Sequence, residues 1–189
     1  MEIGKLIVFS APSGSGKTTL VKHLLKQNLS LGFSISATSR KPRGEEEDGI
    51  AYYFLSKEAF RQKIHEDAFV EYEEVYKDNF YGTLKTEVQR LCEEGKNILF
   101  DIDVQGGLKI KSKYPENTLA VFVQPPSLEE LEKRLLERST ESKEKIQKRL
   151  YKAEVEMTFS EKFDTILVND DLTQAKKDVV RLVNKFLNS

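Results

Sequence analysis

The sequence predicts an α/β fold built on a parallel sheet, interrupted by two insertions. Apolar runs of strand length alternate with helical patterns along most of the 189 residues, and that alternation is typical of parallel sheets. Residues 33–83 break the rhythm with an aromatic, β-rich stretch, and residues 127–159 break it with densely charged helical sequence. The length suits one compact domain, or a core carrying a small inserted lobe.

The core elements follow one another in a regular order. Strands are expected at residues 5–10, 97–101, 119–123 and 165–168, each of them a short and largely apolar run. Helices are expected at residues 18–27 and 104–113. A closing helix follows Asp170 and Asp171, which are plausible caps, and its apolar residues have helical spacing: Ala175, Val179, Leu182, Val183 and Phe186.

The two insertions have different characters. The first is predicted to be a small mixed lobe, with strands at residues 33–36, 52–55, 69–76 and 80–82 and a helix at residues 57–67. The second is predicted to hold two helices. Ser127 and Glu130 form the pattern of a capping box at the start of the first helix, and residues 139–142 separate the two.

Composition excludes several classes of protein. Hydrophobic residues make up 39% and charged residues 32%, which suits a globular protein with a proper core. A net charge of −1 argues against a broad nucleic-acid-binding surface. No apolar run approaches the roughly 20 residues that a membrane helix needs, and the N-terminal run lacks the flanks of a signal peptide. We therefore expect a cytoplasmic protein with no membrane partner, either a monomer or a homodimer.

Cysteine usage is equally informative. Cys92 is the only cysteine, so an intrachain disulfide is impossible and the two-cysteine zinc motifs are excluded. It lies in a helical pattern, where a half-buried structural thiol is the expected state.

A glycine-rich segment between the first strand and the first helix has the pattern of a phosphate-binding loop. Its glycines let successive N–H groups point at an anion, and the following helix adds its positive N-terminal end. A lysine can reach the β- and γ-phosphates, and a threonine hydroxyl can ligate Mg²⁺. Alanine stands where the pattern usually begins with glycine, and the alternative is a Gly/Ser turn that happens to precede a lysine. The candidate ATP-binding residues here are Ala11, Pro12, Ser13, Gly14, Ser15, Gly16, Lys17, Thr18 and Thr19.

The strand at residues 97–101 supplies an acidic partner for this loop. It ends in Asp101, which would lie at the carboxyl edge of the sheet. Asp103 faces the same side if the extension continues. We expect Thr18 and Asp101 to form the Mg²⁺ side of the site; the alternatives are a solvated strand end and, for Asp103, a helix cap.

Five ordered segments after the loop resemble the guanylate kinase family, over nearly the whole chain: residues 36–45, 69–72, 81–83, 101–106 and 169–171. The resemblance implies a P-loop NTPase core at about 1–32, 84–126 and 160–189. It also implies that the lobe at about 33–83 binds the nucleoside monophosphate and that residues 127–159 form a helical lid. The implied activity is transfer of the γ-phosphoryl group of ATP to GMP or dGMP, giving ADP and GDP, with Mg²⁺.

The residues of the first insertion make chemical sense of a GMP site. Pro42 favours an extended backbone, so that Arg40 and Arg43 would project from one side and hold a phosphate bidentately. Glu71 matches the family's guanine reader, because one carboxylate can accept from both N1–H and the 2-amino group of guanine. The resemblance adds Tyr52 and Tyr81 at the phosphate and Ser36, Thr83 and Asp103 at the base. Alone, these residues would be a basic turn, two core tyrosines and an exposed strand acid.

In the second insertion the resemblance implies three arginines that approach the ATP phosphates when the lid closes: Arg134, Arg138 and Arg149. For each of them, a solvated partner of a nearby glutamate such as Glu130 is the alternative. Ser139 stands where the family commonly has glycine, which would stiffen the hinge. Asn169 and Asp170 match the region near the adenine, with helix capping by Asp171 as the competing use.

Two other kinds of protein fit parts of this pattern. A guanylate-kinase-like protein-binding domain resembles the enzyme over the same length, but such domains typically lack a working phosphate loop. A GTPase should carry an Asn-Lys-x-Asp motif, whereas Asn184 and Lys185 are followed by Phe186 and Leu187. A kinase for another monophosphate is opposed only by Glu71.

Overall fold

The computed structural model describes residues 4–138 and 143–189. Its centre is a five-stranded sheet in the order β2-β7-β1-β8-β9, in which all neighbours are parallel. The strands are β1 (Leu6–Ser10), β2 (Leu31–Phe33), β7 (Asn97–Asp101), β8 (Thr118–Gln124) and β9 (Thr165–Val168). The predicted parallel core is confirmed, and the strands at 97–101 and 165–168 have the predicted bounds.

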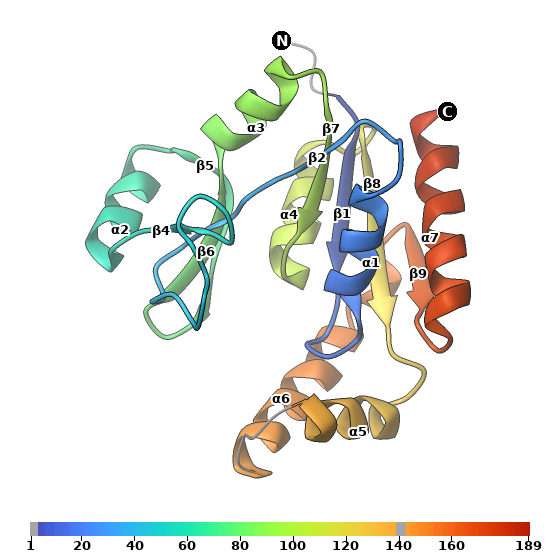
Figure 1. Ribbon diagram of the computed structural model, residues 1–189. Helices are drawn as coiled ribbons and strands as arrows, with labels where there is room; N and C mark the ends of the chain where they lie inside the picture. Colours follow the sequence, from blue (N-terminus) through green and yellow to red (C-terminus); the bar gives the residue numbers. More distant parts are fainter. Residues whose placement is uncertain (1–3, 139–142) are drawn as a thin grey trace.

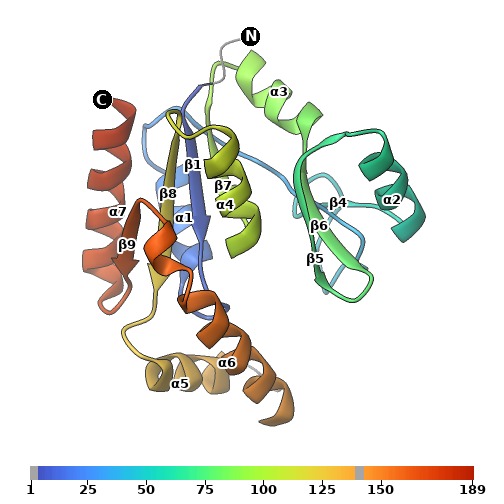
Figure 2. The same cartoon turned by 180° about the vertical axis from the view of Figure 1, so that it is seen from behind.

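Helices cover both faces of this sheet (Figures 1 and 2). Helices α1 (Lys17–Leu25) and α7 (Leu172–Leu187) pack on one face, where Ile7, Phe9 and Val179 belong to one apolar cluster. Helices α3 (Lys85–Glu93) and α4 (Val104–Lys113) pack on the other. Because β1 and β8 are buried on both faces, their sequences are continuous apolar runs rather than alternating ones.

A second, four-stranded sheet in the order β4-β3-β6-β5 lies beside the first. Its strands are β3 (Ala37–Thr38), β4 (Tyr53–Phe54), β5 (Phe69–Tyr76) and β6 (Asn79–Leu84), and helix α2 (Lys57–His65) packs on it. Phe60 of α2 stacks on Phe69 and Phe80, with ring centroids 4.5 and 5.4 Å apart. This sheet therefore has an apolar core of its own.

One predicted strand belongs elsewhere. The sequence predicted residues 33–36 as the first strand of the inserted lobe, but Phe33 pairs with Leu99 at the edge of the five-stranded sheet. The N–H of Ser34 still donates to the carbonyl of Leu99, and residues 34–36 then cross to the second sheet. The apolar residues around Phe33 complete the edge beside β7, a pairing that local pattern cannot reveal.

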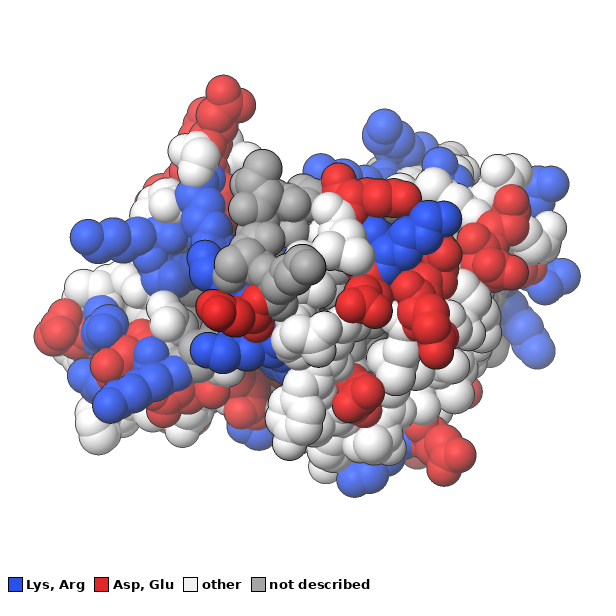
Figure 3. All heavy atoms as spheres, turned by 90° about the horizontal axis from the view of Figure 1, so that it is seen from below, with Lys and Arg blue, Asp and Glu red and all other residues white. Residues whose placement is uncertain are grey.

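Helices α5 (Leu128–Arg138) and α6 (Lys143–Met157) pack against each other through Leu131, Leu135, Ile146 and Ala153. The hydroxyl of Ser127 accepts from the N–H of Glu130, as a capping box requires. The predicted interruption at residues 139–142 lies outside the described residues. Seen from the α5–α6 end, basic and acidic side chains are interspersed (Figure 3), and no described helix is long and apolar enough to cross a membrane.

Candidate active site

The phosphate-loop sequence forms a tight turn between β1 and α1. Gly14 and Gly16 have φ of 99° and 91°, which L side chains rarely adopt. Gly16 is also the N-cap of α1, so the loop ends where the positive end of the helix begins. Ala11 is buried and its φ is not positive; alanine is therefore accommodated without strain at the place usually held by glycine.

Strand pairing brings an acid to this loop. Phe9 of β1 is opposite Asp101 of β7, and the Asp101 carboxylate lies beside the start of α1. Its Oδ1 is 2.6 Å from the Nζ of Lys17, and its Oδ2 accepts from the Thr18 hydroxyl at 3.1 Å. The Nζ of Lys17 also donates to the carbonyl of Ile102 at 2.8 Å. The structure thus joins the predicted lysine, hydroxyl and carboxylate in one network.

Asp103 caps helix α4, which the sequence analysis gave as the alternative use of this residue. Its Oδ1 accepts from the N–H groups of Gln105 and Gly106 at 2.9 and 3.1 Å. The Asp103 carboxylate lies near that of Glu71, because both are close to Gly106. A Cβ at Gly106 would lie 2.7 Å from Oε2 of Glu71, so the absence of a side chain there leaves room for the Glu71 carboxylate; Oδ2 of Asp103 would be at an ordinary contact distance of 3.6 Å.

Glu71 is a buried carboxylate, not an exposed strand acid. Only 5% of its surface is exposed, and it is opposite Thr83 in the β5–β6 pairing. The Thr83 hydroxyl donates to its Oε1 at 2.7 Å. Burial, opposed by this hydrogen bond and reinforced by Asp103, raises the pKa of Glu71 to about 7. Ser36 is buried as well.

Arg40 is the centre of a polar cluster on the second sheet. Its Nε donates to the Tyr81 hydroxyl at 3.0 Å, and its guanidinium lies over the Tyr52 ring, 4.8 Å from the centroid. Nη1 and Nη2 bind the two oxygens of Glu46 at 2.6 and 2.8 Å. The hydrogen bonds from Arg40 hold the pKa of Glu46 at about 2, well below its ordinary value.

Arg43 lies exposed on the same turn as Arg40. Its backbone N–H donates to Oε2 of Glu46 at 2.9 Å, so the same carboxylate binds the side chain of Arg40 and the backbone of Arg43. Sequence reasoning missed Glu46. It stands in a run of acids, Glu45 to Asp48, and nothing in that run distinguishes the acid that turns back to Arg40.

Arg149 of α6 contacts the phosphate loop, and Arg134 of α5 contacts Asn169, which in turn binds the loop. An Nη2 hydrogen bond joins Arg149 to the Ser13 hydroxyl. The Nη1 of Arg134 donates to the carbonyl of Asn169 at 3.1 Å, and its Nε donates to Glu130 at 3.1 Å; the expected pairing with glutamate and the approach to the loop therefore coexist. The side chain of Arg138 lies outside the described part of the structure, as does Ser139.

Asn169 lies beneath the phosphate loop. It is buried, and its Nδ2 donates to the carbonyl of Ser15 at 2.7 Å. A Cβ at Gly16 would be 2.2 Å from that nitrogen, so Gly16 is required for space as well as for its φ. Asp170 is exposed, and Asp171 caps α7 by accepting from the N–H of Gln174.

The fold and this constellation define a class of protein. A parallel sheet with a phosphate loop at the end of β1, an acid at the end of the neighbouring strand and a guanidinium cluster on an inserted sheet is the arrangement of a P-loop nucleotide kinase. The guanylate kinase family model matches residues 3–186. The chain belongs to the guanylate kinase family.

Individual relatives agree with this assignment. The chain is 56% identical to a guanylate kinase of Bacteroides thetaiotaomicron, with 98% of this chain and 91% of the relative covered. It is 52% identical to a guanylate kinase of Porphyromonas gingivalis, with 97% and 98% covered. Among solved structures, the guanylate kinase of Anaplasma phagocytophilum is similar, with a TM-score of 0.76 at 27% identity over 98% of this chain and 87% of that one.

Proposed function

We propose that the protein transfers the γ-phosphoryl group of ATP to GMP, or to dGMP, and releases ADP and GDP. The main support for GMP as the acceptor is Glu71, a buried carboxylate that accepts a hydrogen bond from Thr83. It lies in the same inserted lobe as Arg40 and Arg43, the two arginines suited to binding a phosphate. Guanine offers N1–H and its 2-amino group to one carboxylate, whereas adenine presents a lone pair at N1. A buried polar site rejects the partner that leaves its groups unpaired.

The proposed GMP site spans the second sheet and the start of α4. The geometry at Arg40 supports the phosphate end, because its guanidinium already binds two oxygens of a carboxylate, and a phosphate offers oxygens of similar spacing. Arg43, Tyr52 and Tyr81 complete that end. The base end is formed by Glu71, Thr83, Ser36 and Asp103.

The proposed ATP site is the loop of residues 11–19, with Lys17 at the β- and γ-phosphates. Arg134, Arg138 and Arg149 would offset the remaining charge from the helical side, which two observed contacts favour: Arg149 with Ser13 and Arg134 with Asn169. We assign Asp170, which matches the family's region near the adenine, to the adenine end. We assign Asn169 to the support of the loop, since it is buried and bound to Ser15.

The oxygen set of Thr18 and Asp101 fits Mg²⁺. This ion prefers one or two protein oxygens together with waters and substrate phosphates, and the hydroxyl and carboxylate are already 3.1 Å apart. Among the described residues, no group of three or more His, Cys, Asp and Glu could hold a metal ion. When bound, the ion neutralises charge on the β- and γ-phosphates.

The chemistry needs positioning more than proton transfer. The acceptor phosphate has a second pKa near 6 and is already nucleophilic at neutral pH, so the protein supplies no general base. Lys17 and the arginines of α5 and α6 stabilise charge as it moves, while Arg40 and Arg43 hold the acceptor in line. Closing the two sites together excludes water, which would otherwise hydrolyse ATP. No covalent intermediate with the protein is involved.

We further propose the division into a core (about 1–32, 84–126 and 160–189), a GMP-binding lobe (about 33–83) and a helical lid (about 127–159). The separate apolar clusters of the second sheet and of the α5–α6 pair support it. A cytoplasmic monomer or homodimer, with no nucleic-acid or membrane partner, completes the proposal.

A coupled assay with ATP tests the function. GMP, dGMP, AMP, UMP and CMP are compared, with and without Mg²⁺. We expect turnover with GMP and dGMP only, and only with the metal. Lys17→Ala should lower kcat by about 10²–10³-fold, the usual cost of removing one preformed group that stabilises transition-state charge. Binding of a phosphopeptide with no turnover of any monophosphate would favour a protein-binding domain instead.

A further inference from the structure

A buried carboxylate, that of Glu87, joins the two places where the chain passes between the sheets. The chain leaves the five-stranded sheet through residues 34–36, after β2, and returns at the junction of β6 and α3. Glu87 lies in the first turn of α3, and 3% of its surface is exposed. Neither the sequence patterns nor the function proposed above assigns it a role.

Each of the two oxygens of this carboxylate accepts two hydrogen bonds. Oε1 accepts from the backbone N–H of Ile35 at 3.0 Å and from Nη2 of Arg90 at 2.8 Å. Oε2 accepts from the Tyr53 hydroxyl at 3.0 Å and from Nε of Arg90 at 3.0 Å. Burial opposes ionisation, but these donors outweigh it and lower the pKa of Glu87. The group is therefore a charged acceptor that joins its own helix α3 to the segment at Ile35 and to Tyr53 of β4.

The residues it binds lead directly to the proposed base contacts. Ile35 immediately precedes Ser36, and the carbonyl of Ser36 accepts from the backbone N–H of Tyr53 at 3.0 Å. On the other side, α3 follows β6, the strand that carries Thr83. Glu87 thus ties the segment bearing one proposed guanine contact to the helix that continues the strand bearing another.

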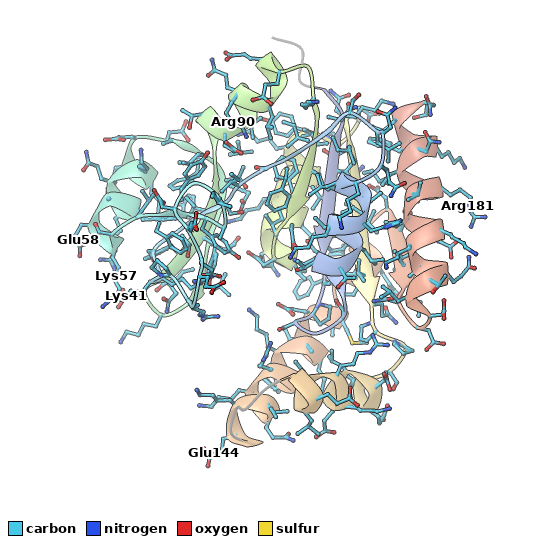
Figure 4. All side chains as sticks on the ribbon, in the orientation of Figure 1. Lys41, Lys57, Glu58, Arg90, Glu144 and Arg181 are labelled. Carbon is cyan, nitrogen blue, oxygen red and sulfur yellow. The ribbon has the colours of Figure 1, made fainter. Side chains whose placement is uncertain are left out.

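A simple helix-stabilising ion pair does not account for these contacts. Arg90 lies on α3 near the junction of the two sheets (Figure 4) and also pairs with Glu94, at 2.6 Å. Glu94 is half exposed, and surface pairs of that kind contribute little. Glu87 differs because it also accepts from the partly buried donors of Ile35 and Tyr53, which would lose these partners without it.

We propose that Glu87 is a positioning residue for GMP, holding Ser36 and Thr83 in one rigid frame so that the guanine pocket is assembled before the nucleotide arrives. The inference rests on the proposed function. It predicts that loss of the carboxylate weakens GMP binding selectively, because the hydrogen bonds to the Glu87 carboxylate among the described residues come from Ile35, Tyr53 and Arg90 and none comes from the phosphate loop or from α5 and α6.

Steady-state kinetics of four variants test the proposal, with GMP varied at saturating ATP and then the reverse. Glu87→Ala should raise KM for GMP about tenfold, the scale of losing one or two buried hydrogen bonds, and change kcat and KM for ATP less than about twofold. Glu87→Gln should recover much of the loss, since its amide oxygen can still accept from Ile35. Tyr53→Phe should raise KM for GMP by a smaller factor. Glu94→Ala removes the other carboxylate bound to Arg90 and should match the parent.

Several outcomes would overturn the proposal. One is a Glu87→Ala protein that melts earlier but keeps the parent KM for GMP, which would leave only a structural role. Another is an equal rise in KM in Glu87→Ala and Glu87→Gln. That result would mean that the loss of negative charge next to Arg90 causes the effect, and not the loss of the hydrogen bond to Ile35. If Glu87→Ala does not fold, an unchanged KM in Tyr53→Phe decides against the proposal. Failure of the parent to phosphorylate GMP would instead remove the proposed function, so the two failures are distinguishable.

Discussion

The two cations proposed to bind phosphates, Lys17 and Arg40, each pair with a carboxylate, but the two carboxylates are held in place differently. Lys17 is bound by Asp101, which ends a central strand of the five-stranded sheet and is held there by its pairing with β1. Arg40 is bound by Glu46, which belongs to an irregular turn six residues along the chain. The position of Asp101 next to Lys17 is therefore fixed by strand pairing in the sheet, whereas Glu46 and Arg40 belong to the same short segment of the chain.

The difference indicates two roles for the same kind of contact. A carboxylate held by a rigid strand stays in place when a nucleotide arrives, so Asp101 remains available to the metal side of the site. A carboxylate on a turn can give way to a ligand that presents similar oxygens. We therefore expect Asp101 to act in the reaction and Glu46 to exchange with the phosphate of GMP.

Asp101→Asn should have the largest effect, since it removes the charge opposite both Lys17 and Thr18. We expect kcat to fall by about 10²–10³-fold, as for other preformed electrostatic contacts, with a raised Mg²⁺ requirement. Kinetics at increasing Mg²⁺ measure this. A parent-like kcat at ordinary Mg²⁺ would show that the strand carboxylate is not part of the metal site.

Arg40→Gln should act on the acceptor side. It removes a partly buried guanidinium, and charged hydrogen bonds of this kind contribute about 1.5–3 kcal/mol, so KM for GMP should rise roughly 10- to 100-fold while KM for ATP stays near the parent value. Arg61→Gln is a matched control, because Arg61 pairs with exposed Asp78 on the same lobe and should leave both constants unchanged. Equal effects in the two variants would contradict an acceptor role for Arg40.

Glu71→Gln should erode the preference for GMP over AMP roughly tenfold, the cost of one mismatched buried hydrogen bond. It should also reduce the pH dependence of GMP binding. The pKa of Glu71 is raised to about 7, so GMP, which needs the ionised carboxylate, should bind the parent more tightly as pH rises from 6 to 8. The phosphate of GMP titrates in the same pH range with either protein. The Glu71→Gln variant is therefore the control, and the difference between parent and variant reports the contribution of Glu71. Discrimination like that of the parent would mean that another group reads the base.

The same shift in Glu71 predicts how folding stability changes with pH. Because the folded pKa lies above the unfolded value, the free energy of unfolding should be highest below about pH 4.5 as far as this group is concerned, and its contribution should be lost as pH rises through about 7. Thermal melting of the parent and of Glu71→Gln across this window, taken as a difference, isolates the effect of the one carboxyl group.

Glu46→Gln should have the smallest effect, because it weakens an ion pair with Arg40 that the phosphate of GMP is expected to replace. We expect KM for GMP within about threefold of the parent, on the scale of a partly exposed ion pair, and an unchanged kcat. A fall in kcat as large as that of Asp101→Asn would remove the distinction between the two carboxylates.

Local pattern predicted much of this molecule. The core strands at residues 97–101 and 165–168, the helix at residues 104–113 and the cap at Ser127 appear as predicted, because burial periodicity and capping chemistry are encoded in neighbouring residues. The meeting of Lys17, Thr18 and Asp101 was also predictable, since parallel strands end at one edge of a sheet. The roles of the family-matched residues stay predictions that the experiments above test.

What could not be predicted depends on partners distant in sequence or hidden in a charged run. Phe33 was assigned to the wrong sheet because the choice of β7 as its neighbour is made by tertiary packing. Glu46 is one acid among several, and Glu87 resembles any exposed helical glutamate until Ile35 and Tyr53 are seen beside it. Burial of a carboxylate is decided by what covers it, and no window of sequence contains that information.

The bond between Asn169 and Ser15 joins two segments that lie 154 residues apart in the chain. Ser15 lies in the loop after β1, and Asn169 directly follows β9 at one edge of the five-stranded sheet. Loss of the amide would leave the carbonyl of Ser15 without this partner. The conformation of the loop therefore depends on the placement of β9 as well as on the residues of the loop itself.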